Sequence, residues 1–230
     1  MLQYDGWLSG VLEKPVYHVS GNALDISTRD IPEENCFIDA KAPVEDLSSV
    51  KHLEDLGFRL IDTNVQLVRK SEPIKIQNYG SRFANESDKK SVCKVAGSSF
   101  TQSRFHLDQK IPRKIADKVK SEWAGNFFQK KRGDWMVVSE IDGNVVGFLQ
   151  LLKKNEATIV IDLIAVAPGH QGMGIGKSMI SFAINNCLEG NPNVIVGTQI
   201  ANTNSLKTYN NLGFRTSSAQ YVFHLHKSKL

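Results

Sequence analysis

Apolar residues recur along the chain at two spacings, which predict helices and strands in turn. One apolar residue in every four from Ile111 to Phe127 predicts an amphipathic helix, and Pro112 suits its first turn. Further helices are predicted over residues 85–96, 175–188 and 203–212. Runs rich in β-branched residues predict strands over residues 135–141, 145–152, 158–167, 194–200 and 221–225. The chain is therefore expected to combine both element types in one core.

A turn in the middle of the chain indicates that the predicted elements do not form a simple series of βαβ units. The residues Asp142, Gly143 and Asn144 lie between two predicted strands, and an Asp-Gly pair is typical of a hairpin turn. A hairpin joins antiparallel strands, whereas a strand–helix–strand unit joins parallel ones. We therefore predict an α/β fold (α+β in character) with a mixed sheet.

One segment is repeated within the chain. Residues 49–59 read SVKHLEDLGFR and residues 205–215 read SLKTYNNLGFR. Each copy predicts a short helix that ends at a glycine and is followed by a strand, because a left-handed residue after a helix favours glycine. Leu53 stands where Tyr209 stands, and no glycine-rich loop precedes the first copy. The repeat and a polar stretch near residue 71 predict a smaller, degenerate module over residues 1–72 and the catalytic domain over residues 73–230.

A glycine-rich loop lies between a predicted strand and a predicted helix. Residues 170–178 read HQGMGIGKS. The P-loop pattern fails because Gln171 occupies the place of its first glycine, and the Rossmann pattern fails because the glycines alternate. Free N–H groups at a helix start still favour a phosphate group, and glycines let those groups approach closely. The alternative is a plain strand-to-helix turn.

Two motifs in the second half of the chain resemble those of the GNAT N-acetyltransferases. The segment DLIAVAPGHQGMGIGKSMISFAI is similar to the family's acetyl-CoA motif, in which Gln/Arg-x-x-Gly-x-Gly/Ala joins a strand to a helix. The segment NTNSLKTYNNLGF matches the family's second motif at Asn202, Ser205, Tyr209, Gly213 and Phe214. The resemblance covers residues 74–225 and implies the GNAT acyl-CoA acyltransferase fold, with a smaller GNAT-like module before it.

The resemblance also implies that acetyl-CoA is the cosubstrate. The loop is then expected to hold the CoA pyrophosphate through backbone N–H groups. Residues 161–166 are expected to pair with the pantetheine arm and to offer an N–H to the oxyanion. The implied cofactor-binding residues are Ile164, Ala165, Val166, Gln171, Gly172, Met173, Gly174, Ile175, Gly176, Lys177, Asn202 and Ser205.

Two residues are candidates for proton transfer. By resemblance, Tyr209 gives a proton to the departing CoA thiolate. Asp162 lies inside an apolar strand, where a buried carboxylate needs a purpose. The family's catalytic glutamate, where present on this strand, falls at Val160 here, so its role does not carry over. Asp162 is therefore a general base, an acceptor-binding group or a structural hydrogen-bond acceptor, and a water chain is an equal alternative as base.

A narrower resemblance concerns the acceptor. The segments SSFTQSRF (98–105) and QIANT (199–203), together with the small first module, are similar to the TDP-fucosamine acetyltransferases. These enzymes acetylate the 4-amino group of a dTDP-linked 4-amino-4,6-dideoxy-galactose for cell-surface glycans. The resemblance implies a nucleotide-sugar acceptor that contacts Gln102, Arg104 and Tyr221. Arg104 as an ordinary ion-pair residue and Tyr221 as a core residue stay open. So do another amine as acceptor (peptide, polyamine or antibiotic) and a non-catalytic CoA-binding module.

Composition and charge narrow the partners. The chain has 230 residues, of which 41% are hydrophobic, and a net charge of +4, which does not by itself indicate nucleic acid. Residues 104–132 hold nine basic and three acidic residues, which form either a solvated face or a basic wall near an anionic substrate.

The sequence contains no pattern that predicts a metal site or a signal for export. The cysteines Cys36, Cys93 and Cys187 lack metal or redox spacing, and His224 and His226 share a strand face without a third ligand, so no metal is expected. Neither a signal peptide nor a membrane span is evident in the sequence. We expect a cytoplasmic protein that binds neither nucleic acid nor membrane, and a homodimer is compatible with this expectation.

Overall fold

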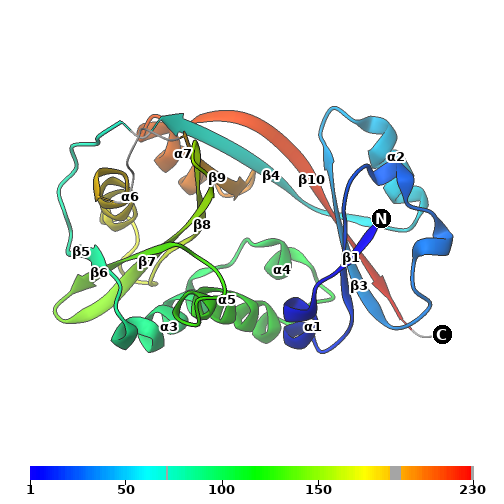
Figure 1. Cartoon of the computed structure of the whole chain (residues 1–230), viewed down its shortest axis with the longest axis horizontal. Helices are drawn as coiled ribbons and strands as arrows, with labels where there is room; N and C mark the ends of the chain where they lie inside the picture. The colour runs from blue at the N-terminus through cyan, green and yellow to red at the C-terminus, as the bar shows by residue number, and fades with distance from the viewer. Residues whose placement is uncertain (71, 187–192, 229–230) are drawn as a thin grey trace.

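A computed structural model describes residues 1–70, 72–186 and 193–228, and these residues form one ten-stranded sheet flanked by helices (Figure 1). The strand order across the sheet is β1-β2-β3-β10-β4-β9-β8-β7-β6-β5. The strands are β1 (Leu2–Tyr4), β2 (Val16–Val19), β3 (Cys36–Pro43), β4 (Arg59–Lys70), β5 (Ser81–Phe83), β6 (Trp135–Ile141), β7 (Asn144–Asn155), β8 (Thr158–Val166), β9 (Asn193–Gln199) and β10 (Arg215–Lys227). The α-helices are α1 (Gly6–Leu12), α2 (Leu47–Asp55), α3 (Lys89–Ser99), α4 (Arg104–Leu107), α5 (Arg113–Phe128), α6 (Ile175–Asn186) and α7 (Thr203–Asn211). The predicted mixed α/β fold is confirmed.

Helices cover both faces of the sheet. In Figure 1, β7 and β8 lie between α6 on one side and α3 and α5 on the other. Strand β8 contacts both layers, because a β-bulge between Ile161 and Leu163 changes which face its buried side chains occupy: Ile161 packs in the α6/α7 cluster and Leu163 in the α3/α5 cluster. A strand buried on both faces needs apolar residues at nearly every position, as this strand has.

The repeated segment folds alike in both copies. Helices α2 and α7 are nine residues long. The side chain of Asp46 accepts a hydrogen bond from the Ser49 N–H at the start of α2. The side chain of Asn202 accepts one from Ser205 in the same way at the start of α7. Gly57 and Gly213, which follow the two helices, have φ of 89° and 81°. The prediction of two glycine-terminated helices, each followed by a strand, is confirmed.

The two copies exchange strands across an approximate twofold axis. Strand β4, which follows α2, pairs with β9, and β10, which follows α7, pairs with β3. Asn64 pairs with Gln199, and the residues 156 positions away in each case, Gln220 and Pro43, pair with each other. Asn64 and Gln220 also pair where β4 meets β10. The sheet is therefore continuous across the predicted boundary at residue 72.

Several predicted elements differ in length from the observed ones. Strand β10 begins at Arg215, six residues before the predicted start, because its first half is polar and exposed while its backbone pairs with β4. Helix α5 continues past Gly125, where a Cβ would lie 3.2 Å from the Cys93 sulfur, so the glycine allows α3 and α5 to approach. Helix α6 is described to Asn186, and the remainder of the predicted helix lies outside the described residues.

Candidate functional site

The sheet opens between β8 and β9. These two parallel strands pair from Thr158 to Ile161 on β8 and from Asn193 to Val196 on β9. Strand β8 then continues to Val166 along β7, whereas β9 continues along β4. Beyond the last pair, one edge of β8 has no neighbouring strand among the described residues. An extended ligand can therefore hydrogen-bond to this edge as an additional strand would.

A β-bulge lies at the point where the strands part. Gln150 on β7 pairs with Leu163, and Leu151 pairs with Ile161, so Asp162 is the extra residue on β8. The bulge directs Asp162 and the next residue toward the same face, that of α5, where Trp123 hydrogen-bonds to the carboxylate. Bulges reorient backbone groups and often stand beside active sites.

The glycine-rich loop offers a row of free N–H groups beside this opening. Among the described residues, no N–H from Gln171 to Lys177 donates a backbone hydrogen bond, and the first bond at this end runs from Ser178 to the Gly174 carbonyl. Gly172 and Gly174 have φ of 80° and 86°, which lets the chain turn its N–H groups inward. The loop precedes α6, so its N–H groups and the helix dipole favour an anion at the same place.

Tyr79 packs over this loop, a contact that the sequence did not reveal. Its N–H donates to the Ser178 hydroxyl at 2.9 Å, and a Cβ on Gly174 would lie 3.3 Å from its ring. The hydroxyl of Ser81 also bonds that of Ser178, at 2.8 Å. The Lys-Ser pair that resembled a P-loop therefore contributes a structural serine. No periodicity in the sequence links residues so far apart.

A side chain at Gly174 is expected to weaken acetyl-CoA binding. In Gly174→Val, a β-branched residue has to hold a left-handed φ of 86° beside the Tyr79 ring. Such strain costs about 1–3 kcal/mol, so the dissociation constant should rise about tenfold or more in calorimetric titration with acetyl-CoA. Gly143→Val is the matched control, because Gly143 has φ of 74° in a hairpin turn with nothing near its Cβ. Equal affinities in the two variants would contradict a phosphate-binding loop.

Tyr209 lies on α7 and is 4% exposed, in the cluster that also contains Ile164 of β8. Its ring packs against Phe214 with 5.4 Å between the centroids. Burial raises the pKa of the Tyr209 hydroxyl above its usual range. The hydroxyl therefore keeps its proton at neutral pH, as a proton donor must.

Asn202 and Ser205 together cap α7 in the structure. The capping bond is 3.2 Å long, and Asp46 and Ser49 make its counterpart in the first copy. Capping therefore accounts for Asn202, whereas Ser205 contributes only its backbone N–H to the cap. Their contact with the cofactor remains a prediction.

The Asp162 carboxylate is surrounded by donors. Oδ2 accepts from Trp123 Nε1 at 2.8 Å and from Gln150 Nε2 at 3.1 Å. Arg132 donates to both oxygens, at 2.7 and 2.6 Å. The Asp162 side chain is only 6% exposed. Of the roles that the sequence left open, this arrangement favours a structural acceptor, because four donated hydrogen bonds already occupy the two carboxylate oxygens.

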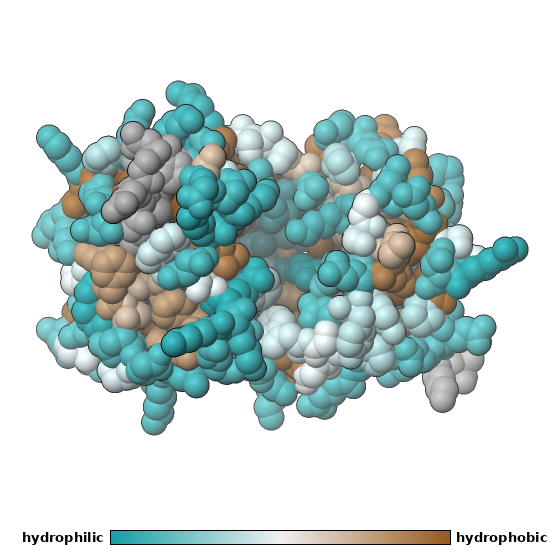
Figure 2. All heavy atoms as spheres, viewed as in Figure 1, coloured by the Kyte–Doolittle hydropathy of each residue, from teal (hydrophilic) through white to brown (hydrophobic). Residues whose placement is uncertain are grey.

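A polar recess separates the two halves of the molecule. Figure 2 shows it near the centre of the view, with mostly hydrophilic atoms at its visible surface. Alternation along the strands directs polar residues toward the α4/α5 face, opposite the apolar residues that meet α6 and α7. These residues are Asp39, Lys41, Asp62, Asn64, Gln199 and Gln220. Because this face of the sheet centre is polar, it is better suited to bind a polar ligand than to pack against other apolar side chains.

Asp62 is a member of this recess that the sequence did not reveal. It is 7% exposed, and burial raises the pKa of its carboxyl, while hydrogen bonds from the Thr63 N–H and from Gln199 act in the opposite direction. A carboxyl group in a polar strand carries no pattern that distinguishes it from a surface residue. Only the exchange of strands places β4 at the sheet centre.

The three predicted acceptor-binding residues lie in different environments. Arg104 reaches across to the first module, where its Nη1 lies 2.6 Å from Asp39 Oδ2, and its guanidinium stacks on Phe105. Gln102 is exposed just before α4. Tyr221 packs against the α2 cluster beside Phe223, on the face opposite the recess. The structure therefore brings Arg104 to the recess wall and directs Tyr221 toward the core.

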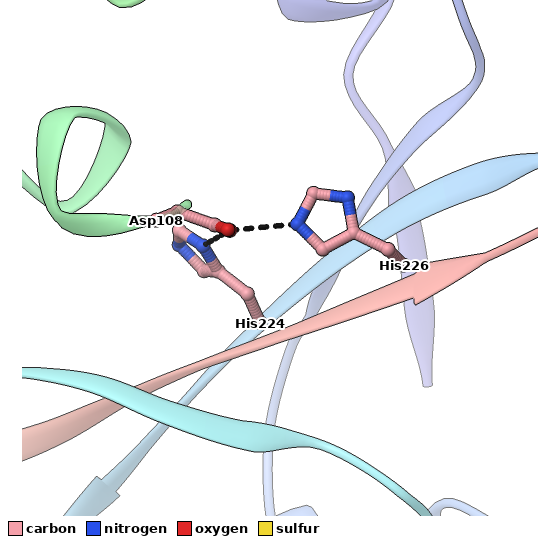
Figure 3. Close-up of side chains that lie close together, drawn as sticks. All are labelled: Asp108, His224 and His226. Carbon is pink, nitrogen blue, oxygen red and sulfur yellow. Dashed lines mark hydrogen bonds and ion pairs between the residues drawn. The ribbon is translucent and has the colours of Figure 1, made fainter. Parts of the chain in front are cut away.

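A third polar group joins the two histidines of β10. Figure 3 shows Asp108 between His224 and His226, and its Oδ2 lies 2.7 Å from His224 Nδ1 and 2.6 Å from His226 Nε2. Lys14 Nζ lies 3.2 Å from the remaining nitrogen of His226. Because an ammonium only donates, His226 accepts there and donates from Nε2 to Asp108. The sequence missed this third group because Asp108 is more than one hundred residues away; the absence of a metal remains a prediction.

Two further findings concern the helices and cysteines that the structure describes. None of the described helices has the length and apolar character to span a membrane. Cys36 and Cys93 are free thiols, and Cys187 lies outside the described residues.

Comparison with known proteins agrees with this architecture. The chain is 30% identical to the spore coat polysaccharide biosynthesis protein SpsD of Bacillus subtilis, over 97% of this chain and 82% of that protein. It is 26% identical to the dTDP-fucosamine acetyltransferase of Escherichia coli, over 80% of this chain and 79% of that protein.

Solved structures share the fold at lower identity. A putative GNAT-family acetyltransferase from Novosphingobium aromaticivorans has a TM-score of 0.59 at 15% identity, covering 87% of this chain and 79% of that one. A tandem GNAT protein of the clavulanic acid pathway has a TM-score of 0.56 at 13% identity, covering 84% and 64%. The acetyltransferase (GNAT) family model matches residues 101–214. The chain therefore belongs to the GNAT family of N-acetyltransferases, whose fold binds acetyl-CoA.

Proposed function

We propose that this N-acetyltransferase transfers the acetyl group of acetyl-CoA to the amino group of a dTDP-linked amino-dideoxy sugar. The observation that carries this proposal is the polar recess, which adjoins the edge where β8 leaves β9. The edge suits an extended pantetheine arm, and the recess suits a hydrophilic acceptor. The two substrates would then meet at the bulge of Asp162.

The glycine loop and the free edge of β8 bind different parts of the cofactor. The N–H groups from Gln171 to Lys177 hold the pyrophosphate, and the backbone of Ile164 and Val166 pairs with the pantetheine arm. Gln171 donates its side-chain amide to the Val166 carbonyl at 3.1 Å, which ties the loop to the strand. The two cofactor-binding parts are thereby kept in register, as an oriented thioester requires.

Direct transfer then needs few groups. The acceptor amine attacks the thioester carbon, and an N–H of the β8 segment 164–166 stabilises the oxyanion. The C–S bond breaks, and Tyr209 gives its proton to the CoA thiolate as general acid. The raised pKa of the Tyr209 hydroxyl supports this role, because the donor remains protonated throughout the neutral range.

The charges of the recess support an anionic acceptor. Arg104 and Lys41 both lie beside the Asp39 carboxylate, which also hydrogen-bonds to His18. The cationic groups in this corner therefore outnumber its carboxylate, and a diphosphate would balance the excess positive charge. Asp39 and Lys41 belong to the first module, which on this proposal supplies one wall of the acceptor site although it lacks a glycine loop. The names of the two relatives refer to a spore coat polysaccharide and to dTDP-fucosamine, which also supports a sugar as the acceptor.

The proposal is tested by the release of free thiol from acetyl-CoA in the presence of matched acceptors. We expect release with dTDP-4-amino-4,6-dideoxy-galactose or its gluco epimer, and none with the 3-amino isomer or with spermine. We also expect dTDP alone to compete with the sugar nucleotide and not with acetyl-CoA. Release with spermine only, or a lack of competition by dTDP, would overturn the sugar assignment while leaving the acetyltransferase in place.

A further inference from the structure

A buried cation on α5 has no acidic partner within the part of the chain that the structure describes. Lys120 of α5 is 8% exposed, and among the described residues its ammonium group has neither a hydrogen bond nor an ion pair. Its Nζ lies 4.8 Å from the centroid of the Trp123 ring and 4.9 Å from that of Phe100. Aromatic faces attract a cation, but they replace little of the hydration that burial removes. A lysine held in this way is costly in its charged form.

The neighbouring charges increase this cost. Arg104 of α4 and Arg132, which follows α5, repel the Lys120 ammonium, and Asp162 of β8 attracts it. Asp162 is bonded to Arg132, and Asp39 to Arg104, so each acid of this group already neutralises an arginine. Burial, followed by the charge of Arg104, lowers the pKa of Lys120 to about 8. Neutral and charged lysine therefore coexist near the pH of the cell.

The position of Lys120 connects it with the reacting groups. Its ring neighbour Trp123 hydrogen-bonds to Asp162, which is the bulge residue at the point where β8 leaves β9. Arg104, the residue expected to meet the anionic part of the acceptor, is also close enough for its charge to act on Lys120. Lys120 thus lies near both the place of the thioester and the place of the diphosphate, where the acceptor's amino group has to lie.

We propose that Lys120 is the proton acceptor of the reaction, which takes a proton from the acceptor's ammonium group so that the free amine can attack acetyl-CoA. This proposal rests on the proposed function and names the base that the sequence could not supply, since Val160 replaces the family's glutamate. The four hydrogen bonds on Asp162 leave that carboxylate poorly suited to the task.

The protons balance as follows. Neutral Lys120 takes one proton from the ammonium group, and the freed lone pair forms the N–C bond to the thioester carbon. The C–S bond breaks, and the thiolate takes a proton from Tyr209. The new amide nitrogen loses its surplus proton to the Tyr209 oxygen, which restores the phenol. Lys120 then releases its proton to water, so the products are the amide, CoA thiol and one proton.

The test compares Lys120→Met and Lys120→Arg with the wild-type enzyme across pH. Arginine keeps the charge but cannot act as a base near neutral pH. At about pH 7 we expect kcat to fall about 10²-fold or more in both variants. At about pH 9.5 the deficit should shrink to a few-fold, because the acceptor amine is then largely free. A merely structural lysine would give a deficit that does not depend on pH.

Two controls distinguish the loss of a proton acceptor from a loss of folding and from a loss of acetyl-CoA binding. Lys118→Met changes an exposed lysine two residues away, which lies 3.7 Å from Glu13, and should leave kcat unchanged. Lys120→Met should bind acetyl-CoA as the wild type does and unfold at a higher temperature, because it removes a buried charge. An arginine variant with full kcat at neutral pH would overturn the proposal.

A second measurement needs no acceptor. The titration of Lys120, followed by NMR in protein that carries isotope-labelled lysine and assigned with Lys120→Arg, should give a pKa well below that of ordinary lysines. An ordinary pKa would overturn the proposal for Lys120 whatever the acceptor. A lowered pKa without acetylation of any sugar would instead refute the proposed acceptor and retain the lysine as a base for another amine.

Discussion

Tyr209→Phe is expected to lower kcat about 10²- to 10⁴-fold while the affinity for acetyl-CoA stays within a few-fold of the wild type. The substitution removes one hydroxyl and keeps the ring that packs on Phe214. Without a donor, the CoA thiolate departs unprotonated into a buried site, where the charge is poorly solvated. Steady-state release of thiol gives kcat, and calorimetry gives the affinity.

The pH profile of the same enzyme gives a second expectation. Because burial raises the pKa of Tyr209, the proton donor remains loaded well above neutral pH, so its loss should cause no fall in kcat below about pH 10. Tyr17→Phe is the control, since the Tyr17 hydroxyl bonds the exposed Glu34 far from the opening. Full turnover in Tyr209→Phe would refute the role of general acid.

Asp162→Asn is expected to destabilise the fold by about 2–3 kcal/mol. The change removes the charge that Arg132 and Trp123 share and places an amide group, itself a donor, against those donors. The lower end of the range reflects Arg132, whose side chain is 41% exposed and partly solvated. Chemical denaturation measures the free energy of unfolding directly.

The same variant decides between the roles that the sequence left open for Asp162. A structural acceptor predicts loss of stability, with kcat falling only as the bulge deforms. A general base predicts loss of kcat with the unfolding free energy unchanged, and that result would refute the structural role. Glu156→Gln is the matched control, because its pair with Lys153 is exposed and should contribute less than about 0.5 kcal/mol.

Much of the fold followed from local patterns in the sequence. The hairpin strands, the helix of residues 111–127 and the repeated helices have strong periodicity or turn residues, and all of them are observed. The strand over residues 215–220 was missed because Arg215, Thr216, Ser217, Ser218 and Gln220 are all polar. Backbone pairing with β4 places this segment in the sheet. Hydrophobic periodicity reflects the burial of side chains, so it does not reveal a strand whose side chains are exposed.

The loop that suits acetyl-CoA could be predicted from the sequence, whereas the polar recess could not. The loop that suits acetyl-CoA is contiguous in sequence, so its glycines and the following helix were visible together. The recess is assembled from β3, β4, β9, β10, α4 and α5. Lys120 looks like any helix lysine, and its burial depends on Phe100 and Trp123 meeting it in space. Groups whose role arises from distant partners leave no local signal.

The exchange of strands between the two copies also sets the order of events during synthesis. Strand β4 leaves the ribosome early, but both of its neighbours in the sheet, β9 and β10, are made more than a hundred residues later. Until then its two edges present unpaired N–H and C=O groups, which favour association with other chains. Sheet closure therefore depends on contacts of large sequence separation, which form slowly. The growing polypeptide is most vulnerable to aggregation during the interval before β10 emerges, and chaperones that shield open strand edges would act on it then.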